Sequence, residues 1–386
     1  MNNPNSHTVV THKGYFKRLM ESFGKVVLGI VLFIGSFAVL YMNEGRVDMS
    51  EVAVNAVEAS AEAVSAELDD QFVYVTDTVS TDEQVGDSMF LNKGDYLAVE
   101  RTVEMYAWVE TSSEETETNL GGSETTTTTY YYNEEWVENV EDSNDFDDSS
   151  YYNPSKTYNS EEFTVSSAKI GAYDLNFDGL ELPKFKKLSL DEEMLDLSEV
   201  GKLQQNYVYI PYVEDYMGTA QGSLSSPDIG DIRISYTVLD NNSDGTVFGK
   251  INGSNLETYY DADTEKSLYR FFDGGRDQAL GTLHGEFKMM LWMMRLLGFV
   301  MMWIGLSSIF GPISVLLDVV PVFGSLSRSV VGVITFLVAL VLSIITIIIS
   351  MIMHSIVALI ITVLVVCGIV LYIMKKKGTK PTVVKV

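Results

Sequence analysis

Residues 329–374 read SVVGVITFLVALVLSIITIIISMIMHSIVALIITVLVVCGIVLYIM, and these 46 residues include no Asp, Glu, Lys or Arg. A helix needs about 20 apolar residues to cross a bilayer, so the stretch is long enough for two crossings. Its main polar cluster, at 350–355, marks the break between them. The sequence therefore predicts transmembrane helices over 330–350 and 355–374.

Two more apolar stretches lie elsewhere in the chain. Residues 296–317, LLGFVMMWIGLSSIFGPISVLL, carry no charge, although Gly311-Pro312 within them either kinks the helix or ends it early. Residues 26–42, VVLGIVLFIGSFAVLYM, follow a basic flank, as the core of a signal peptide would, but no small-residue cleavage site comes after them. We therefore predict a retained anchor at 26–42 and a further span at 296–317, which makes four transmembrane helices.

Basic residues set the predicted orientation. Lys and Arg gather before the first span, in the tail 1–25, and after the last span, in the tail 375–386. The positive-inside rule places both tails in the cytoplasm, which an even number of spans permits. Residues 318–329 then form a cytoplasmic loop, and residues 43–287 form an extra-cytoplasmic or lumenal domain. The chain is predicted to be an integral multi-pass membrane protein with both termini cytoplasmic.

The long segment between the first two spans has the alternation of β-strands. In VEMYAWVE, residues 103–110, one face is wholly apolar and the other carries two aromatic side chains between two glutamates. Thr and Tyr, which favour pleated surfaces, fill residues 125–138, and we pair this run with the first as a hairpin. The acidic connection 111–124 is predicted to be a mobile tip.

Other segments complete a mainly β domain. An Ala-rich amphipathic pattern predicts a helix over 50–69. Between clusters of Gly, Asn and Asp, strands are predicted at 71–79, 207–213, 231–239, 246–251 and 267–272. The predicted fold class is α+β: a membrane protein with four transmembrane helices and a large, mainly β extra-cytoplasmic domain, long enough for two β subdomains.

Acidic residues concentrate in this domain. Of the 53 Asp and Glu residues, only Glu21 and Asp318 lie outside residues 43–287. Such a field repels nucleic acid, so nucleic-acid binding is excluded, and it attracts cations and basic partners. The domain has one histidine, His284, and the chain's one cysteine, Cys367, lies in a predicted span. Without a thiol and with a single imidazole in the domain, we expect no enzyme, no catalytic residue and no cofactor.

Two short stretches, DLNFDG and DNNSDG, repeat the opening of a calcium loop, with oxygen donors at alternate positions before a glycine. The candidate ligands are Asp174, Asn176, Asp178, Asp240, Asn242 and Asp244. A complete loop ends in Glu at its twelfth position, where Phe185 and Ile251 stand instead. Asx turns between strands give the same pattern, so we favour turns and keep the six residues as candidates.

Six short motifs point to a family. They are NEGR at 43–46, VEMYAWVE at 103–110, YNEEW at 132–136, NPS at 153–155, GDIRISY at 230–236 and PVF at 321–323. Their order and the predicted topology resemble the LUMA (transmembrane protein 43) family over nearly the whole chain. The resemblance implies the endoplasmic reticulum and inner nuclear membrane in a eukaryote, or the plasma membrane in a bacterium. It also implies self-association and the organisation of membrane protein complexes, and it identifies no catalytic residue.

We therefore expect a non-catalytic scaffold whose partners are the lipid bilayer, further copies of the same chain and other membrane proteins. Small residues spaced four apart, Ser307 to Gly311 and Ala339 to Ser343, suit helix packing in a membrane. The alternative is a cation channel, or a regulator of one, with the acidic domain as its vestibule. No charged residue lies in the middle of a predicted span, which argues against a charge-lined ion path.

Overall fold

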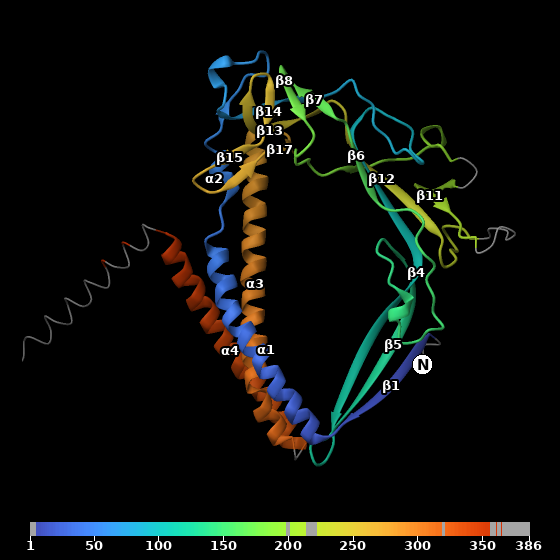
Figure 1. Cartoon of the computed structure of the whole chain (residues 1–386), viewed down its shortest axis with the longest axis vertical. Helices are drawn as coiled ribbons and strands as arrows, with labels where there is room; N and C mark the ends of the chain where they lie inside the picture. Colours follow the sequence, from blue (N-terminus) through green and yellow to red (C-terminus); the bar gives the residue numbers. More distant parts are fainter. Residues whose placement is uncertain are drawn as a thin grey trace, which may run out of the picture. The chain divides into compact units, whose positions relative to one another are not determined.

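The structure is a computed structural model that describes residues 5–197, 201–213, 222–318 and 321–355 together with residues 360 and 364; for 321–328 it describes the backbone alone (Figure 1). The chain divides into two compact units. Unit 1 comprises the described residues of Met1–Val9, Asp48–Glu115 and Thr127–His284. Unit 2 comprises those of Val10–Val47, Thr116–Thr126 and Gly285–Val386.

The first sheet has eight strands and runs β1–β5–β4–β12–β11–β10, with β6 paired to β4 and β9 to β12. Its strands are β1 (Ser6–Lys13), β4 (Tyr96–Thr118), β5 (Glu124–Val137), β6 (Glu161–Thr164), β9 (Lys186–Lys187), β10 (Lys202–Gln204), β11 (Tyr207–Ile210) and β12 (Ile232–Asp240). The predicted hairpin is confirmed, because β4 and β5 are adjacent in this path. The outer end of that hairpin, Thr116–Thr126, belongs to unit 2.

The second sheet has seven strands and lies in unit 1. Its order is β17–β13–β14–β8–β7–β3–β2, and an additional pairing of β13 with β3 closes five of these strands into a small barrel. The strands are β2 (Val57–Glu58), β3 (Phe72–Ser80), β7 (Ser167–Ile170), β8 (Tyr173–Asn176), β13 (Ser243–Asn252), β14 (Asn255–Glu257) and β17 (Arg270–Asp273). A separate ribbon pairs β15 (Tyr259–Asp261) with β16 (Lys266–Leu268).

Strand β4 follows the alternation that the sequence predicts. The inward side chains Val103, Met105 and Ala107 are at most 1% exposed and join the core beneath the first sheet. The alternate side chains are partly exposed. Among these, Glu104 accepts two hydrogen bonds, of 2.7 and 2.9 Å, from Arg233 on β12. The strand is therefore half-buried, with a core face and an outer face that carries charge.

A buried polar network ties β4 to β12 in unit 1. Arg101, 1% exposed, donates to Asp87 at 2.6 Å, and the hydroxyl of Tyr236 donates to the second oxygen of the same carboxylate at 2.6 Å. Burial and the bond to Asp87 raise the pKa of Tyr236 far above its ordinary value, so its hydroxyl stays protonated and remains a donor. A buried charge needs such partners, because an unpaired one is costly.

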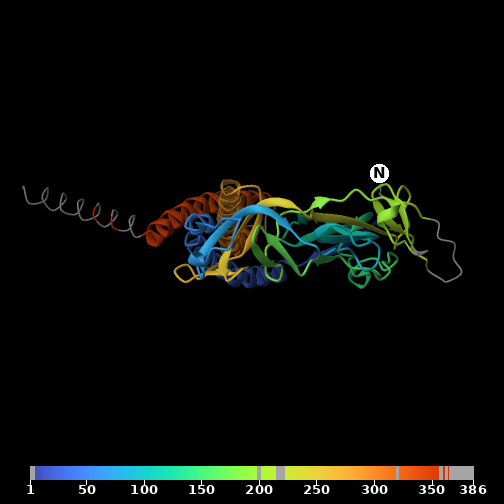
Figure 2. The ribbon, with the colours of Figure 1, turned by 90° about the horizontal axis from the view of Figure 1, so that it is seen from above.

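Three long helices supply unit 2: α1 (Tyr15–Glu44), α3 (Arg276–Leu317, whose first turns belong to unit 1) and α4 (Pro321–His354). By length and composition, helices over Tyr15–Ala53, Arg276–Leu317 and Ser329–His354 are able to cross a membrane. In Figures 1 and 2, α1 and α4 lie side by side. The predicted spans 26–42, 296–317 and 330–350 fall within these helices, and only residues 355, 360 and 364 of the predicted span 355–374 are described.

Small residues allow close contacts between the helices of unit 2. A Cβ atom added to Gly29 of α1 would lie 2.8 Å from the carbonyl oxygen of Gly305 on α3. On α4, Ala339 and Ser343 are at most 3% exposed. The small-residue spacing predicted on α4 is therefore used for packing inside this chain.

The helix predicted over 50–69 is wrong. α2 spans only Met49–Ala53, and the chain then enters β2 and a short 3₁₀ helix, η1 (Ala66–Leu68). β2 pairs with β3, and Ala59, 3% exposed, packs in the barrel core. The short Ala and Val side chains offered a weak helical stripe, and pairing with the sheet overrode it.

The prediction of a long mobile tip at 111–124 is also wrong. β4 continues to Thr118 and β5 begins at Glu124, so only residues 119–123 form the turn. Gly121 and Gly122 have positive φ angles of 88° and 79°, which glycine adopts at little cost. Thr-rich flanks favour strand, and the turn glycines close it tightly. Similarly, residues 321–329 of the predicted loop 318–329 form the start of α4.

Candidate functional site

Charged side chains of unit 2 meet at the C-terminal end of α1. Arg295 on α3 donates two hydrogen bonds, of 2.8 and 2.7 Å, to Glu44. The side chain of Glu44 is only 3% exposed. Nearby, the amide of Asn43 donates to the backbone carbonyl of Leu291 at 3.0 Å. A bidentate, largely buried ion pair therefore joins this end of α1 to α3.

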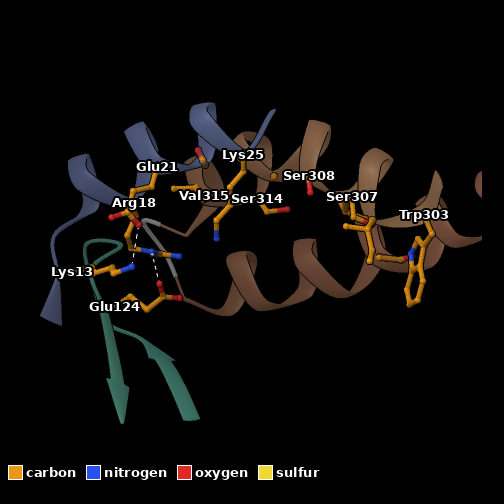
Figure 3. A pocket seen from close by; sticks show the side chains of 15 residues that line it. Lys13, Arg18, Glu21, Lys25, Glu124, Trp303, Ser307, Ser308, Ser314 and Val315 are labelled. Carbon is orange, nitrogen blue, oxygen red and sulfur yellow. Dashed lines mark hydrogen bonds and ion pairs between the residues drawn. The ribbon is translucent and has the colours of Figure 1, made fainter. Parts of the chain in front are cut away.

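Arg18 is the centre of the other end of α1. Its side chain, 5% exposed, donates to Asp318 at 2.5 Å. Arg18 also forms an ion pair with Glu124 at 3.1 Å (Figure 3). It also donates to the backbone carbonyl of Gly122 in the turn of the β4–β5 hairpin. A Cβ atom on Gly122 would lie 2.6 Å from the ring of Tyr15, so this close approach requires glycine. One guanidinium thus joins α1, the end of α3 and the hairpin turn.

The two charged ends are separated by the thickness of a membrane. Arg18 and Glu44 lie 26 positions apart on α1, and at 1.5 Å per residue this spans about 39 Å. A bilayer with its headgroup regions is about 40–45 Å thick. Between the two ends α1 exposes large apolar side chains, among them Val27, Val31 and Ile34, which are 61–66% exposed. The two ion pairs are therefore spaced to lie at the two headgroup regions, where each charge is neutralised by its partner in the chain.

A cleft of about 530 Å³ opens beside the Arg18 cluster (Figure 3). All its lining residues belong to unit 2. Lys13, Arg18, Glu21 and Lys25 supply charges near the start of α1, and Trp303 of α3 lies towards the other side in Figure 3. Serine hydroxyls and aliphatic side chains line the space between. The cleft thus combines three cations, the carboxylates of Glu21 and Glu124, hydroxyls and apolar surface.

The Arg18 cluster bears on the predicted topology. Residues 1–25 were predicted to be cytoplasmic and residues 43–287 extra-cytoplasmic, which puts Arg18 and Glu124 on opposite sides. Their direct ion pair is incompatible with that assignment if α1 crosses the bilayer. The turn at 119–123 and the start of α1 then share one side.

The first calcium candidate, DLNFDG at 174–179, begins within β8 and ends in the turn that follows it. The side chain of Asn176 accepts a hydrogen bond from the backbone of Asp178 at 3.0 Å, and Gly179 has a φ of +83°. This is the Asx-turn geometry that the sequence favours. The carboxylate of Asp174 is engaged elsewhere, because it forms an ion pair with Lys169 at 3.4 Å.

The second candidate, DNNSDG, joins β12 to β13. Asp240 pairs with Lys186, Asp244 accepts from the hydroxyl of Thr78 at 2.5 Å, and Asn242 has a φ of +60°. Among the described residues, no group of three or more His, Cys, Asp or Glu is placed to hold a metal ion. Calcium binding at either loop stays a prediction, because both loops hold their conformation through contacts within the chain.

The histidine of the β domain is engaged with a carboxylate in unit 1. His284 Nδ1 lies 2.6 Å from Asp48 Oδ2, and the other oxygen of Asp48 accepts from the backbone and hydroxyl of Ser50. Asp48 caps α2 through this bond. His354, at the end of α4, lies 2.9 Å from the carbonyl of Ser350. Both contacts have ordinary structural explanations, namely a cap and a helix end.

The Arg18 cluster was missed by sequence reasoning, although a signal was present. Only Glu21 and Asp318 carry negative charge outside residues 43–287, and both form ion pairs at this end of unit 2: Glu21 with Lys13 at 3.1 Å, and Asp318 with Arg18. An isolated acid beside an apolar helix needs a cation. The partner, 300 positions away, follows only from the fold.

Comparison with known proteins identifies a family. A family model described as Transmembrane protein 43 matches residues 105–356. The chain is 26% identical to mouse transmembrane protein 43 over 361 residues, which covers 86% of each chain. It is 26% identical to the human protein over 351 residues, or 84% of this chain and 83% of the human one. A Drosophila melanogaster homolog is 24% identical over 301 residues, 73% of this chain and 75% of the fly protein. No solved structure matches. With its apolar helices and its β-rich unit 1, this chain belongs to the transmembrane protein 43 family.

Proposed function

We propose that this protein is a non-catalytic membrane protein that self-associates and organises other membrane proteins into complexes. The observation that supports it is the distribution of charge in unit 2. Paired charges lie at the two ends of α1, and the described residues of 26–42, 296–317 and 330–350 are uncharged. Such helices offer apolar surface to lipid or to other helices and no charged path through the membrane.

The outer face of α4 is the surface that this proposal assigns to association. Val330, Ile334, Leu337, Val341 and Ile344 are 47–56% exposed and alternate by four and three positions. That spacing forms a continuous stripe along one helix. Ala339 and Ser343 of α4 are buried within the chain, so they are not free to form the contact. Association then rests on side-chain packing between bulky stripes.

Cross-linking in native-like lipid tests the proposal. The full chain should give dimers or larger species, and replacing Leu337 and Val341 by Ala should weaken them. A matched control replaces Val27 and Val31 on α1, which are also exposed. A strictly monomeric particle at native lipid ratios would remove the proposal. Cation flux into vesicles containing the protein separates the channel alternative, because a scaffold conducts no ions.

Co-purification from the native membrane addresses the partners. Mass spectrometry of material captured with the full chain should return integral membrane proteins at stoichiometric levels. The control is the chain carrying Met105→Asp, which places a carboxylate in the core of unit 1. Loss of partners in that variant would assign their recognition to the β-rich unit.

A further inference from the structure

We propose that the cleft between α1, α3 and α4 binds an anionic phospholipid, with the phosphate beside Lys25 and the acyl chains along α3 towards Trp303. Three features carry this assignment: unpaired donors in the cleft, the depth of those donors along the helices, and an open apolar channel leading away from them.

Two donors in the cleft form no hydrogen bond and no ion pair with a described residue. Lys25 is exposed, and it acts on Glu21, four positions before it, only through its charge, which helps to lower the pKa of that carboxyl. Ser314 is only 5% exposed, lines the cleft, and makes no hydrogen bond to a described residue. In contrast, Lys13 and Arg18 are paired with carboxylates. A buried hydroxyl and an ammonium that makes no hydrogen bond to a carboxylate face one space and are donors for an anion.

Both donors lie at the same depth. Lys25 is 19 positions before Glu44 on α1, and Ser314 is 19 positions after Arg295 on α3. Glu44 and Arg295 form one ion pair, so they share a level. At 1.5 Å per residue, 19 positions span about 29 Å, which is the thickness of the hydrocarbon core. Lys25 and Ser314 therefore sit at the opposite hydrocarbon boundary, where phospholipid phosphates lie.

The remainder of the cleft suits an acyl chain. Ile304, Val315 and Val331 line it, and Trp303 is fixed by a hydrogen bond to the carbonyl of Gly332 at 3.2 Å. A Cβ atom on Gly311 would meet nothing within 4 Å, so space is open beside it. Figure 3 shows Lys25 and Ser314 between the Arg18 cluster and Trp303. A headgroup at Lys25 thus has an apolar path along α3.

Quenching of Trp303 fluorescence by brominated lipids tests the proposal. The full chain with Trp292→Phe, which removes the exposed tryptophan at the other end of the span, is placed in vesicles of brominated phosphatidylglycerol or brominated phosphatidylcholine. Trp108 on β4 and Trp136 on β5 remain, but they lie outside the predicted spans, so the quenching by brominated acyl chains reports Trp303. Trp303 should be quenched by the anionic lipid at a concentration about fivefold lower. Equal quenching by the two lipids overturns the proposal.

Three variants define the site. Lys25→Gln should abolish the anionic preference, whereas Lys17→Gln, an exposed cation on α1 that does not line the cleft, should keep it. Gly311→Leu should fill the channel and reduce quenching by the anionic lipid without unfolding, because the position is open and leucine favours helix. Circular dichroism confirms that each variant is folded. A preference that survives Lys25→Gln refutes the assignment.

Soluble phosphate distinguishes a lipid from a free anion. Millimolar inorganic phosphate or glycerol phosphate should leave the quenching unchanged, because neither fills the apolar channel. Full displacement of the brominated lipid by inorganic phosphate would show that the cleft takes the anion alone, and the assignment to a phospholipid would fail.

Discussion

Arg18 Nη2 and Asp318 Oδ2 lie 2.5 Å apart, which joins the start of α1 to the end of α3. Arg295 and Glu44 join the opposite ends of the same two helices. α1 and α3 are therefore antiparallel neighbours held at both ends by ion pairs. Apolar helices have little hydrophobic preference for one another in lipid, so polar contacts at their ends fix which helix lies beside which.

Arg18→Ala should strongly destabilise unit 2. Asp318, 0% exposed, would lose its ion pair with Arg18, and breaking a buried pair costs about 3–5 kcal/mol. Thermal unfolding in mild detergent measures the change. Lys13→Ala is the control, because its ion pair with Glu21 is about 40% exposed and such pairs contribute about 0–1 kcal/mol. Equal unfolding temperatures for the two variants would contradict a buried, stabilising pair.

The hairpin turn and the N-terminal strand should be accessible from one side of the membrane. Leu120, 86% exposed in the turn, and Thr11 on β1 are each replaced by Cys in a Cys367→Ser background. Both belong to unit 2 with Arg18. A membrane-impermeant maleimide added to sealed, uniformly oriented vesicles should label both positions or neither.

Arg46→Cys is the control for this experiment. It follows the far end of α1, so it should show the opposite labelling from Thr11→Cys. If Leu120→Cys is labelled together with Arg46→Cys and not with Thr11→Cys, the Arg18–Glu124 ion pair does not form in the membrane. That result would support the topology predicted from the basic residues alone.

The periodic parts of the fold were predictable from the sequence. Alternation placed Val103, Met105 and Ala107 in the core, and charge-free runs located three helices. The prediction of a helix over 50–69 failed because a weak Ala-rich stripe fits either a helix or a strand at the edge of the sheet. Pairing with β3 decides between the two. The prediction of a mobile tip at 111–124 failed because it took the acidic composition as a sign of disorder. The threonines and the two turn glycines instead favour a tight hairpin.

The candidate site was beyond reach because it depends on distant residues. The Asx turn at Asn176 is local, and a local pattern predicted it. Arg18 instead meets Glu124 and Asp318, which lie in different elements far along the chain. Lys25 and Ser314 share a depth only once Glu44 and Arg295 are known to pair. Long-range pairing of this kind leaves no short motif.

Glu162→Gln should stabilise unit 1 at neutral pH. Glu162 on β6 lies opposite Glu100 on β4, and burial, then the charge of Glu100, raises the pKa of Glu162 above its ordinary value of 4.5. The folded state holds this proton more tightly than the unfolded state, so the charge costs stability above the folded-state pKa. That cost disappears as the pH falls below the ordinary value.

Urea unfolding followed by tryptophan fluorescence measures this effect. Glu162→Gln should raise the unfolding free energy by less than about 1 kcal/mol at neutral pH and should give no gain near about pH 4. Glu161→Gln is the matched control, because the carboxylate of Glu161 accepts a hydrogen bond from Arg101 at 3.0 Å. Loss of that negative charge should lower the unfolding free energy at neutral pH. A gain for Glu162→Gln of equal size at both pH values would exclude the repulsion.

Met105→Asp should unfold unit 1. Met105 is 1% exposed on the core face of β4, so the substitution buries a carboxylate with no cation beside it and costs several kcal/mol. Thr102→Asp is the control on the same strand, because that residue is on the opposite, partly exposed face. Its cost should stay below about 1 kcal/mol. Limited proteolysis should therefore digest the Met105 variant rapidly and leave the Thr102 variant intact. Equal resistance of the two would mean that the inward face of the hairpin is not part of the core.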